Sequence, residues 1–504
     1  MAEEKQKTEK KKRGVFGQIL IILKWISLIF LGVLLIAALA FHAPWKVTTL
    51  LAIVLLACTI LPKPYRKWFW SSVGAVVIVL VIWVFLPDDN EGWRPYTFDE
   101  ELAALDAGRG IPDEENAAVI YNQLFEIPIL DGNEPEFLIR TTPYSLSGPW
   151  LTKDHPETKQ WLDGHQKTIA TLLKASQRER CWFPIDTIVS VERMDQLPAI
   201  RHMSCLLVSA GNNDMAEGRI DSALEKYLCV IQMAQHLYQQ PPMLDFLVGV
   251  AIEDLASVQL NRFIIEGQPT VEHLQLIWAS VKDLKNNFSS KLISDLEYDK
   301  LYSKMLCCIY YEINESGKTR LTRNPAAAIQ AQFQQEIPAA TYWEGKVYKA
   351  WLLWAWFYMP STPQKVARLI DDSYEKYYAM AEPDFDWAEQ PEEWLSVVST
   401  INFLKVDFNY RYFIKTTADM SESSYYGFHD IYLKRLTLQR GSRLLAAIRR
   451  YQLENGSWPE SLEPIESTVP PEALIDPVTG EKLEYENHGE RFSLYGEKAN
   501  IWPK

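Results

Sequence analysis

The chain has 504 residues, of which 48% are hydrophobic and 23% charged, so it is long enough for two or more domains with apolar cores. Its net charge of −14 is unevenly distributed, because residues 1–87 hold eleven Lys and Arg against three Glu, which leaves −22 for the rest. An acidic excess of that size repels phosphate groups, so it excludes nucleic acid as a partner and argues against flat binding to anionic lipid.

Three apolar runs, 15–41, 47–61 and 69–86, follow a basic tail at residues 1–14. A helix needs about 20 residues to cross the hydrocarbon core of a bilayer. The first run exceeds that length and the third comes close to it, whereas the second has fifteen residues and needs Trp45 in the interface. The pattern predicts an integral membrane protein with three transmembrane helices and the lipid bilayer as a partner.

Lys and Arg residues are concentrated in the tail and in the loop at 62–68. The positive-inside rule places both segments in the cytoplasm, and three crossings then place the chain after residue 87 on the other side of the membrane. If the short second run does not cross, the same rule leaves the large domain in the cytoplasm. We expect the extracytoplasmic arrangement.

The residues after the apolar runs are predicted to be mainly helical. A linker at 87–110 contains a short predicted helix at 99–107, and a helical domain is predicted over 111–424. Apolar residues recur at helical spacing at 157–176, and from residue 194 the helices alternate with Gly- or Pro-containing breaks, which predicts helical hairpins. The later predicted helices are 194–216, 221–237, 243–265, 270–284, 289–313, 342–358, 364–380 and 392–403.

The stretch from Ala216 to Tyr227 resembles the second-helix half of a tetratricopeptide repeat. In that repeat a Gly permits close packing, an Ala fits between helices and an aromatic residue covers the edge, and Gly218, Ala223 and Tyr227 are assigned to these roles. The period is not 34 residues and no array follows, so we expect a solenoid-like region. The middle of the chain, as at 110–117, also resembles helical domains of uncharacterised bacterial membrane-anchored proteins, which implies no activity. With the predicted spans, we expect a bacterial inner-membrane protein.

The last part of the chain, 425–504, is predicted as a long helix followed by a small α+β module. The helix at 425–453 ends at Asn455-Gly456, a C-cap signal, and alternating residues on both sides of 487–490 predict a β-hairpin. This part, with its Trp458-Pro459, Asp476-Pro477 and Gly480 elements, resembles the C-terminal module of the major pseudopilins of type II secretion.

That resemblance implies a long helix packed on a small sheet, with calcium held in the final loop. The processed N-terminal pilin segment is absent here. The final Ser-x-Gly-x-Asp pattern of the family is replaced by Tyr495-Gly-Glu-Lys-Ala-Asn500, so calcium binding is not carried over to this chain.

The sequence contains none of the common catalytic or nucleotide-binding motifs. Ser316-Gly-Lys-Thr319 lacks the Gly that a phosphate-binding loop needs at position 312, which is Glu, and it follows a predicted helix rather than a strand. The five cysteines of the large domain contain no C-x-x-C pair, so we expect buried thiols, with a single Cys205–Cys229 bridge left open.

Several acidic, His and Cys residues have a spacing that invites a functional interpretation. Asp295 and Asp299 lie one helical turn apart, and Asp371 is adjacent to Asp372, but paired-carboxylate catalysis needs two groups across a cleft. Two ligands on one helix do not make a zinc site. We expect structural or solvent-exposed roles for all of the candidates, which further include His202 with Cys205, His236, His429 with Asp430, and the acidic loop 384–393.

The absence of a catalytic constellation, together with the helical hairpins, favours a non-enzymatic scaffold or binding protein of the cell envelope. No catalytic residue, cofactor or metal site is predicted, and the helical domain is expected to bind protein partners. Two alternatives stay open. One is an envelope hydrolase with an unrecognised site, and the other is an accessory component of a secretion or pilus-like system, suggested by the terminal module.

Overall fold

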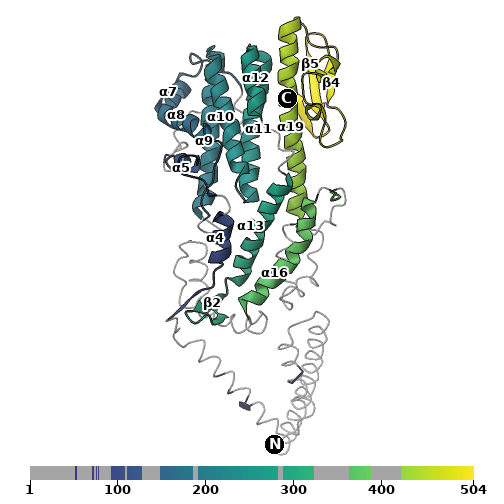
Figure 1. The fold of residues 1–504 in the computed structure, drawn as a ribbon. Coiled ribbons are helices and arrows are strands. Elements are labelled where there is room, and N and C mark those ends of the chain that lie inside the picture. Colours follow the sequence, from purple (N-terminus) through teal and green to yellow (C-terminus); the bar gives the residue numbers. More distant parts are fainter. Residues whose placement is uncertain are drawn as a thin grey trace, which may run out of the picture. The chain divides into compact units, whose positions relative to one another are not determined.

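The fold is taken from a computed structural model of the chain (Figure 1). Apart from six isolated positions before residue 92, the residues that it describes are 92–107, 110–125, 127, 148–185, 191–281, 288–322, 362–382, 384–387 and 422–503. They divide into two compact units.

The predicted integral membrane fold and inner-membrane localisation need correction. Within the described ranges, no helix combines the length and the apolar character that a bilayer crossing requires. The longest helices, α19 (Glu422–Asn455) and α9 (Val191–Ala216), have the length but carry charged side chains along it. The predicted spans 15–41, 47–61 and 69–86 lie outside the described residues except for those isolated positions. The fold that the structure supports is mainly helical with two small sheets.

The first unit contains a three-stranded antiparallel sheet in the order β1 (Trp93–Pro95), β2 (Tyr311–Asn314) and β3 (Thr319–Leu321). The helix predicted at 289–313 is therefore too long: α13 spans Phe288–Cys308, and the chain then enters β2. The cause is local turn chemistry. Gly317 adopts a φ of +77°, and the side chain of Asn314 accepts a hydrogen bond from the backbone N–H of Lys318, which together close a β-hairpin.

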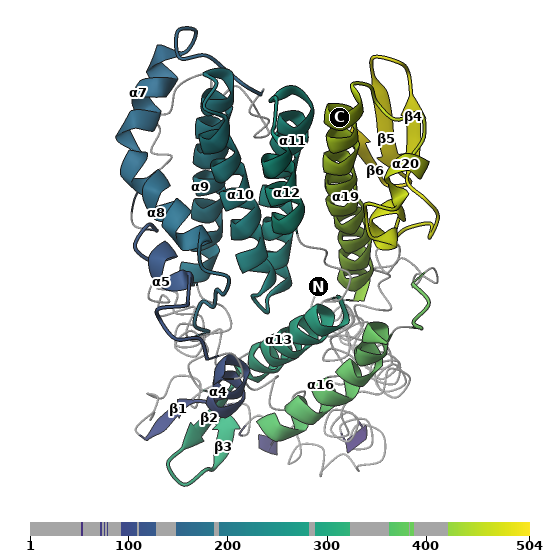
Figure 2. The same cartoon turned by 45° about the horizontal axis from the view of Figure 1, so that its top comes forward.

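The second unit contains the helical hairpins (Figures 1 and 2). Four of the predicted helices are confirmed within a few residues. Their bounds are Val191–Ala216 for α9, Ile220–Tyr238 for α10, Met243–Glu266 for α11 and Val271–Ser280 for α12. Helices α9 and α11 end at the predicted Gly-containing breaks, α10 ends before the Pro241-Pro242 break, and α12 ends four residues before its predicted end. Helix α10 is central, since it packs against α9, α11, α12 and α8 (Gln166–Ser176).

Close packing of α10 against its neighbours depends on two Gly–Tyr contacts. A Cβ atom on Gly211 of α9 would lie 2.7 Å from the ring of Tyr227, and a Cβ on Gly249 of α11 would lie 2.7 Å from the ring of Tyr238. Both rings come from α10. Gly218, to which the sequence assigned the packing role, instead has a φ of +76° and nothing near its Cβ, so it serves the turn after α9.

The helix predicted over 157–176 is two helices, α7 (Pro156–Gly164) and α8. His165, between them, has backbone angles of −103° and 11°, outside the helical region. Its ring Nδ1 hydrogen bonds to the carbonyl of Trp161 at 2.9 Å, which offers the chain an alternative to a continuous helix. The short helix expected at 99–107 is confirmed as α4 (Asp99–Ala107). Helix α5 (Ala118–Tyr121) follows it, and α16 (Pro363–Tyr378) continues into a 3₁₀ turn at Ala379–Ala381.

The C-terminal module packs on α19 (Figure 2). The predicted β-hairpin is confirmed as β4 (Glu484–Asn487) paired with β5 (Phe492–Gly496), and a third strand that the sequence analysis missed, β6 (Ala499–Trp502), pairs antiparallel with β5. Between α19 and β4 lie α20 (Glu463–Glu466) and a 3₁₀ turn at Pro471–Leu474. A long helix on a small sheet is the arrangement that the resemblance to pseudopilins implies, although the resemblance itself stays a prediction.

One apolar core joins the hairpins to this module. It includes Tyr227, Phe263, Leu445, Phe492 and Ile501, each at most 2% exposed. Burial of each such side chain contributes about 1.5–3 kcal/mol. The core therefore holds α10, α11, α12 and α19 in fixed positions relative to one another.

Candidate functional site: a groove on helix α10

A groove of about 470 Å³ runs along α10 between α8 and α12. Its floor is apolar. Leu224 is buried, Leu173 and Leu228 are half-buried, and Leu276 on α12 is 50% exposed. An exposed Leu beside half-buried apolar neighbours marks a surface where a further apolar side chain would gain burial. The groove thus offers a small apolar strip supported by rigid helices.

The edge of the groove is acidic. Glu179, Asp221 and Glu225 line it, all three are exposed, and no Lys or Arg is among the lining residues that the structure describes. Glu179 and Glu225 form no ion pair with any residue in the described ranges. Lys226, the neighbour of Glu225 on α10, is buried and turned to Asp214 on α9, with Nζ 2.6 Å from the carboxylate oxygen. At Glu179 and Glu225 the groove therefore presents negative charge that no described residue neutralises through an ion pair.

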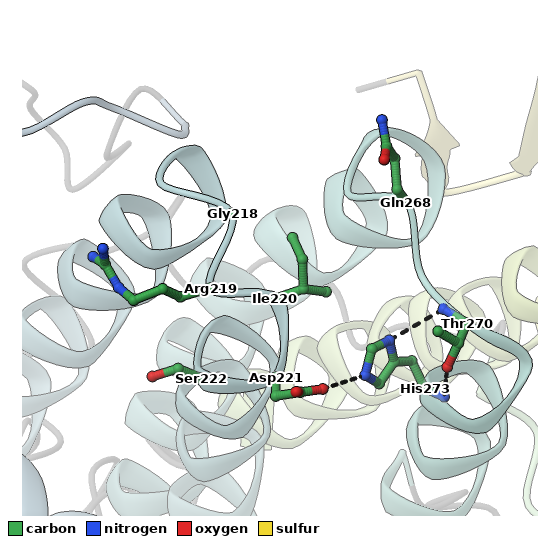
Figure 3. A pocket seen from close by; sticks show the side chains of 8 residues that line it. All are labelled: Gly218, Arg219, Ile220, Asp221, Ser222, Gln268, Thr270 and His273. Carbon is green, nitrogen blue, oxygen red and sulfur yellow. Dashed lines mark hydrogen bonds and ion pairs between the residues drawn. The ribbon is translucent and has the colours of Figure 1, made fainter.

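A polar pocket of about 630 Å³ adjoins one end of the groove, where α10 and α12 begin (Figure 3). His273 bridges the two helices: its Nε2 lies 2.6 Å from Oδ1 of Asp221, and its Nδ1 accepts a hydrogen bond from the backbone N–H of Thr270 at 3.1 Å. The hydroxyl of Thr270 accepts in return from the N–H of His273, which completes a capping box for α12. Both ring nitrogens of His273 are occupied, so its imidazole has no free nitrogen to act as a base.

The other side chains at this end serve the α9–α10 turn. Asp214 accepts hydrogen bonds from Arg219 at 2.7 Å, Ser222 at 2.7 Å and Lys226 at 2.6 Å. Burial alone would raise the pKa of Asp214, but these hydrogen bonds outweigh it and hold the pKa below its ordinary value. In Figure 3 the side chains of Arg219 and Gln268 extend away from the Asp221–His273 pair. The pocket is thus a structural junction at the end of the groove.

The first pair of candidate carboxylates, Asp295 and Asp299, belongs to the second unit. Asp295 has a fully buried side chain that pairs with Lys291, and Asp299 accepts a hydrogen bond from the hydroxyl of Tyr425 at 2.8 Å. Burial raises the pKa of Asp295 to about 7 and that of Asp299 to about 6. A solvent-exposed role is therefore wrong for Asp295, which tertiary packing covers completely, whereas Asp299 is half-buried. Asp371 pairs with Lys304 at 2.9 Å.

The His and Cys candidates are held separately. His236 is buried, with Nδ1 2.9 Å from the hydroxyl of Tyr121 and Nε2 2.7 Å from the carbonyl of Arg178. Burial raises the pKa of the Cys205 thiol to about 12, and Cys205 and Cys229 are both free. Across the described ranges, no three His, Cys, Asp or Glu side chains converge as metal ligands would.

The remaining candidates also lie apart. His429 stacks on Trp387 with ring centroids 4.1 Å apart, and burial lowers its pKa to about 4, whereas Asp430 pairs with Lys498 at 2.9 Å. Ser316 and Thr319 belong to the β2–β3 hairpin. Of the acidic loop 384–393, only 384–387 is described.

A buried polar seam between α11 and α19 was not predicted from the sequence. Arg435 on α19 is 1% exposed and contacts Glu253 at 2.5 Å, Asp254 at 2.7 Å and Ser257 at 2.9 Å, all from α11. Further along, the hydroxyl of Ser442 donates to Asn261 at 2.8 Å. A signal for the seam was present: polar residues follow one another at helical spacing on α11 (253, 257, 261) and on α19 (435, 439, 442).

Comparisons of the chain with protein-family models, with curated proteins and with solved structures returned no match. The groove is therefore interpreted from its own geometry and chemistry.

Proposed function

We propose that this protein is a non-catalytic scaffold that binds a segment of a partner protein in the groove on α10. The observation that carries the proposal is a partly exposed apolar strip, with Leu276 at its surface, bordered by Glu179 and Glu225, which pair with no cation among the described residues. A groove of this kind on packed helices is the arrangement that receives an extended or helical segment.

An enzymatic function has less support. Asp295 is fully buried, Asp299 is half-buried and bonded to Tyr425, and both nitrogens of His273 are already bonded. A general acid or base must reach the reacting proton directly or through one water, which these groups in their present surroundings do not do. We therefore place the binding role first.

The proposal is tested by selecting displayed random peptides of about twelve residues on the purified full chain. The selected peptides are then measured against a variant with Leu228→Asp and Leu276→Asp, which removes the apolar strip. Peptides that bind the wild type should lose roughly tenfold or more in affinity, because two apolar contacts are replaced by charge. The matched control is Leu453→Asp, an exposed Leu near the end of α19. Peptides that bind all three proteins equally would contradict the proposal.

A further inference from the structure

We propose that the segment bound in the groove is a basic amphipathic helix of about three turns, supplied by another protein. This inference rests on the proposed function and names the chemistry of the partner. Its evidence is the order of side chains along α10, the charge of the edge and the width of the apolar strip.

The length of the partner follows from the exposed face of α10. Asp221, Glu225, Leu228 and Gln232 line the groove and follow one another at helical spacing. With a rise of about 1.5 Å per residue, this stripe is about 16 Å long. A partner helix of about eleven residues covers the same length, so three turns fill the groove.

The apolar face of the partner is set by the three helices. Leu173 comes from α8, Leu228 from α10 and Leu276 from α12, so the apolar side chains flank the groove and form its floor. A helix that places apolar residues at positions i, i+3 or i+4, and i+7 on one stripe contacts all three. An extended strand would gain little here, because the lining elements are helices that present no free backbone groups along their sides.

The basic character of the partner follows from the edge. Glu225 lies one helical turn before Leu228 on α10, Glu179 follows the C-terminal end of α8, and Asp221 lies at the polar end. Lys or Arg residues beside the apolar stripe of a partner helix face these carboxylates. The overall charge of −14 adds a long-range attraction that speeds the encounter and weakens with salt.

The test uses two synthetic helical peptides of fourteen residues. In the basic peptide Leu follows the i, i+4, i+7 pattern and the flanking positions are Lys; in the acidic peptide every Lys is replaced by Glu. Fluorescence anisotropy measures binding to the full chain at low and at moderate salt. We expect the basic peptide to bind roughly tenfold or more tightly than the acidic one, with an affinity that falls as salt rises.

A charge-reversal variant separates binding in the groove from general attraction to an acidic protein. Glu179→Lys with Glu225→Lys should lower the affinity for the basic peptide roughly tenfold and raise that for the acidic peptide. The matched control, Glu472→Lys with Glu481→Lys, makes the same change in net charge at exposed positions of the C-terminal module and should leave both affinities within about twofold to threefold.

The outcomes distinguish this inference from the proposed function. The basic-helix inference is overturned if the two charge variants lose equal affinity for the basic peptide. It is also overturned if the wild type binds the basic and the acidic peptide equally. Displayed peptides that depend on Leu228 and Leu276 but lack Lys and Arg also overturn it, and they leave the binding function standing. If no peptide depends on those two Leu residues, both proposals fail.

Discussion

The groove on α10 and the seam between α11 and α19 use the same acidic residue type in opposite ways. In the seam, Glu253 is fully buried and receives hydrogen bonds from Arg435, Gln439 and Tyr238. In the groove, Glu225 is exposed and meets no cation in the described part of the chain. A buried carboxylate is tolerated only with partners, and those partners specify which helix packs where. An exposed carboxylate without a partner contributes little to the fold and stays accessible to a ligand.

The largest change in the free energy of unfolding is expected for a substitution in the seam. Arg435→Ala leaves Glu253 buried and without its cation, which should lower the free energy of unfolding by about 3–5 kcal/mol. Urea denaturation followed by circular dichroism measures it. Arg450→Ala is the matched control on the same helix, because Arg450 forms an exposed pair with Glu454 and its loss should cost under about 1 kcal/mol. Similar losses of unfolding free energy in the two variants would contradict the stabilising role of the buried seam.

The next largest change in the free energy of unfolding is expected at the junction at the end of the groove. Asp214→Ala leaves Lys226 buried without its carboxylate and should cost about 2–3 kcal/mol at neutral pH. Because the pKa of Asp214 is lowered in the folded protein, its contribution is present above the ordinary value of 3.8 and is lost as pH falls through the folded pKa. The stability difference between wild type and variant should therefore narrow below about pH 4. A difference that is constant from pH 7 to pH 3 would exclude this electrostatic origin.

Asp295 should show the opposite pH dependence. Its pKa rises from 3.8 to about 7 on folding, because burial disfavours the charged form. Protonated Asp295 stabilises the fold fully below the ordinary pKa, and this contribution is lost as pH rises from about 4 to about 7. Asp295→Asn removes the titration. The stability of the wild type relative to this variant should fall over that range and then stay level.

Chemical denaturation at several pH values measures the Asp295 effect. Asp430→Asn is its control, since Asp430 is exposed and pairs with Lys498 at the surface. A wild-type curve parallel to that of Asp295→Asn would show that Asp295 is ionised in the folded protein.

The smallest change in stability is expected in the groove. Glu179→Lys with Glu225→Lys should alter the free energy of unfolding by less than about 0.5 kcal/mol, because neither carboxylate is buried or paired within the described structure. The same variant should give the largest change in peptide binding. Thermal unfolding checks the first statement. A loss above about 2 kcal/mol would mean that these residues support the fold, and the contrast with the seam would disappear.

Local signals predicted much of the helical structure. The helix at 99–107 and the end of α11 near Glu266 follow from side-chain spacing and from Gly-containing breaks, which act over a few residues. The same reasoning missed β6 and extended the helix at 289–313 through β2, because a strand gains its hydrogen bonds from another segment. It also favoured a membrane-spanning fold that no described helix supports.

The groove depended on tertiary structure more strongly than the helices did. The sequence by itself determined that α10 is a helix with Asp221, Glu225 and Leu228 on one side, since a period of 3.6 residues places them there. Only the fold decided that α8 and α12 flank this side and that Lys226 turns inward to Asp214. The period of a helix is a property of one segment of the sequence. Which charges pair and which surfaces are covered depends on which segments pack together, and the packing of the whole core determines this.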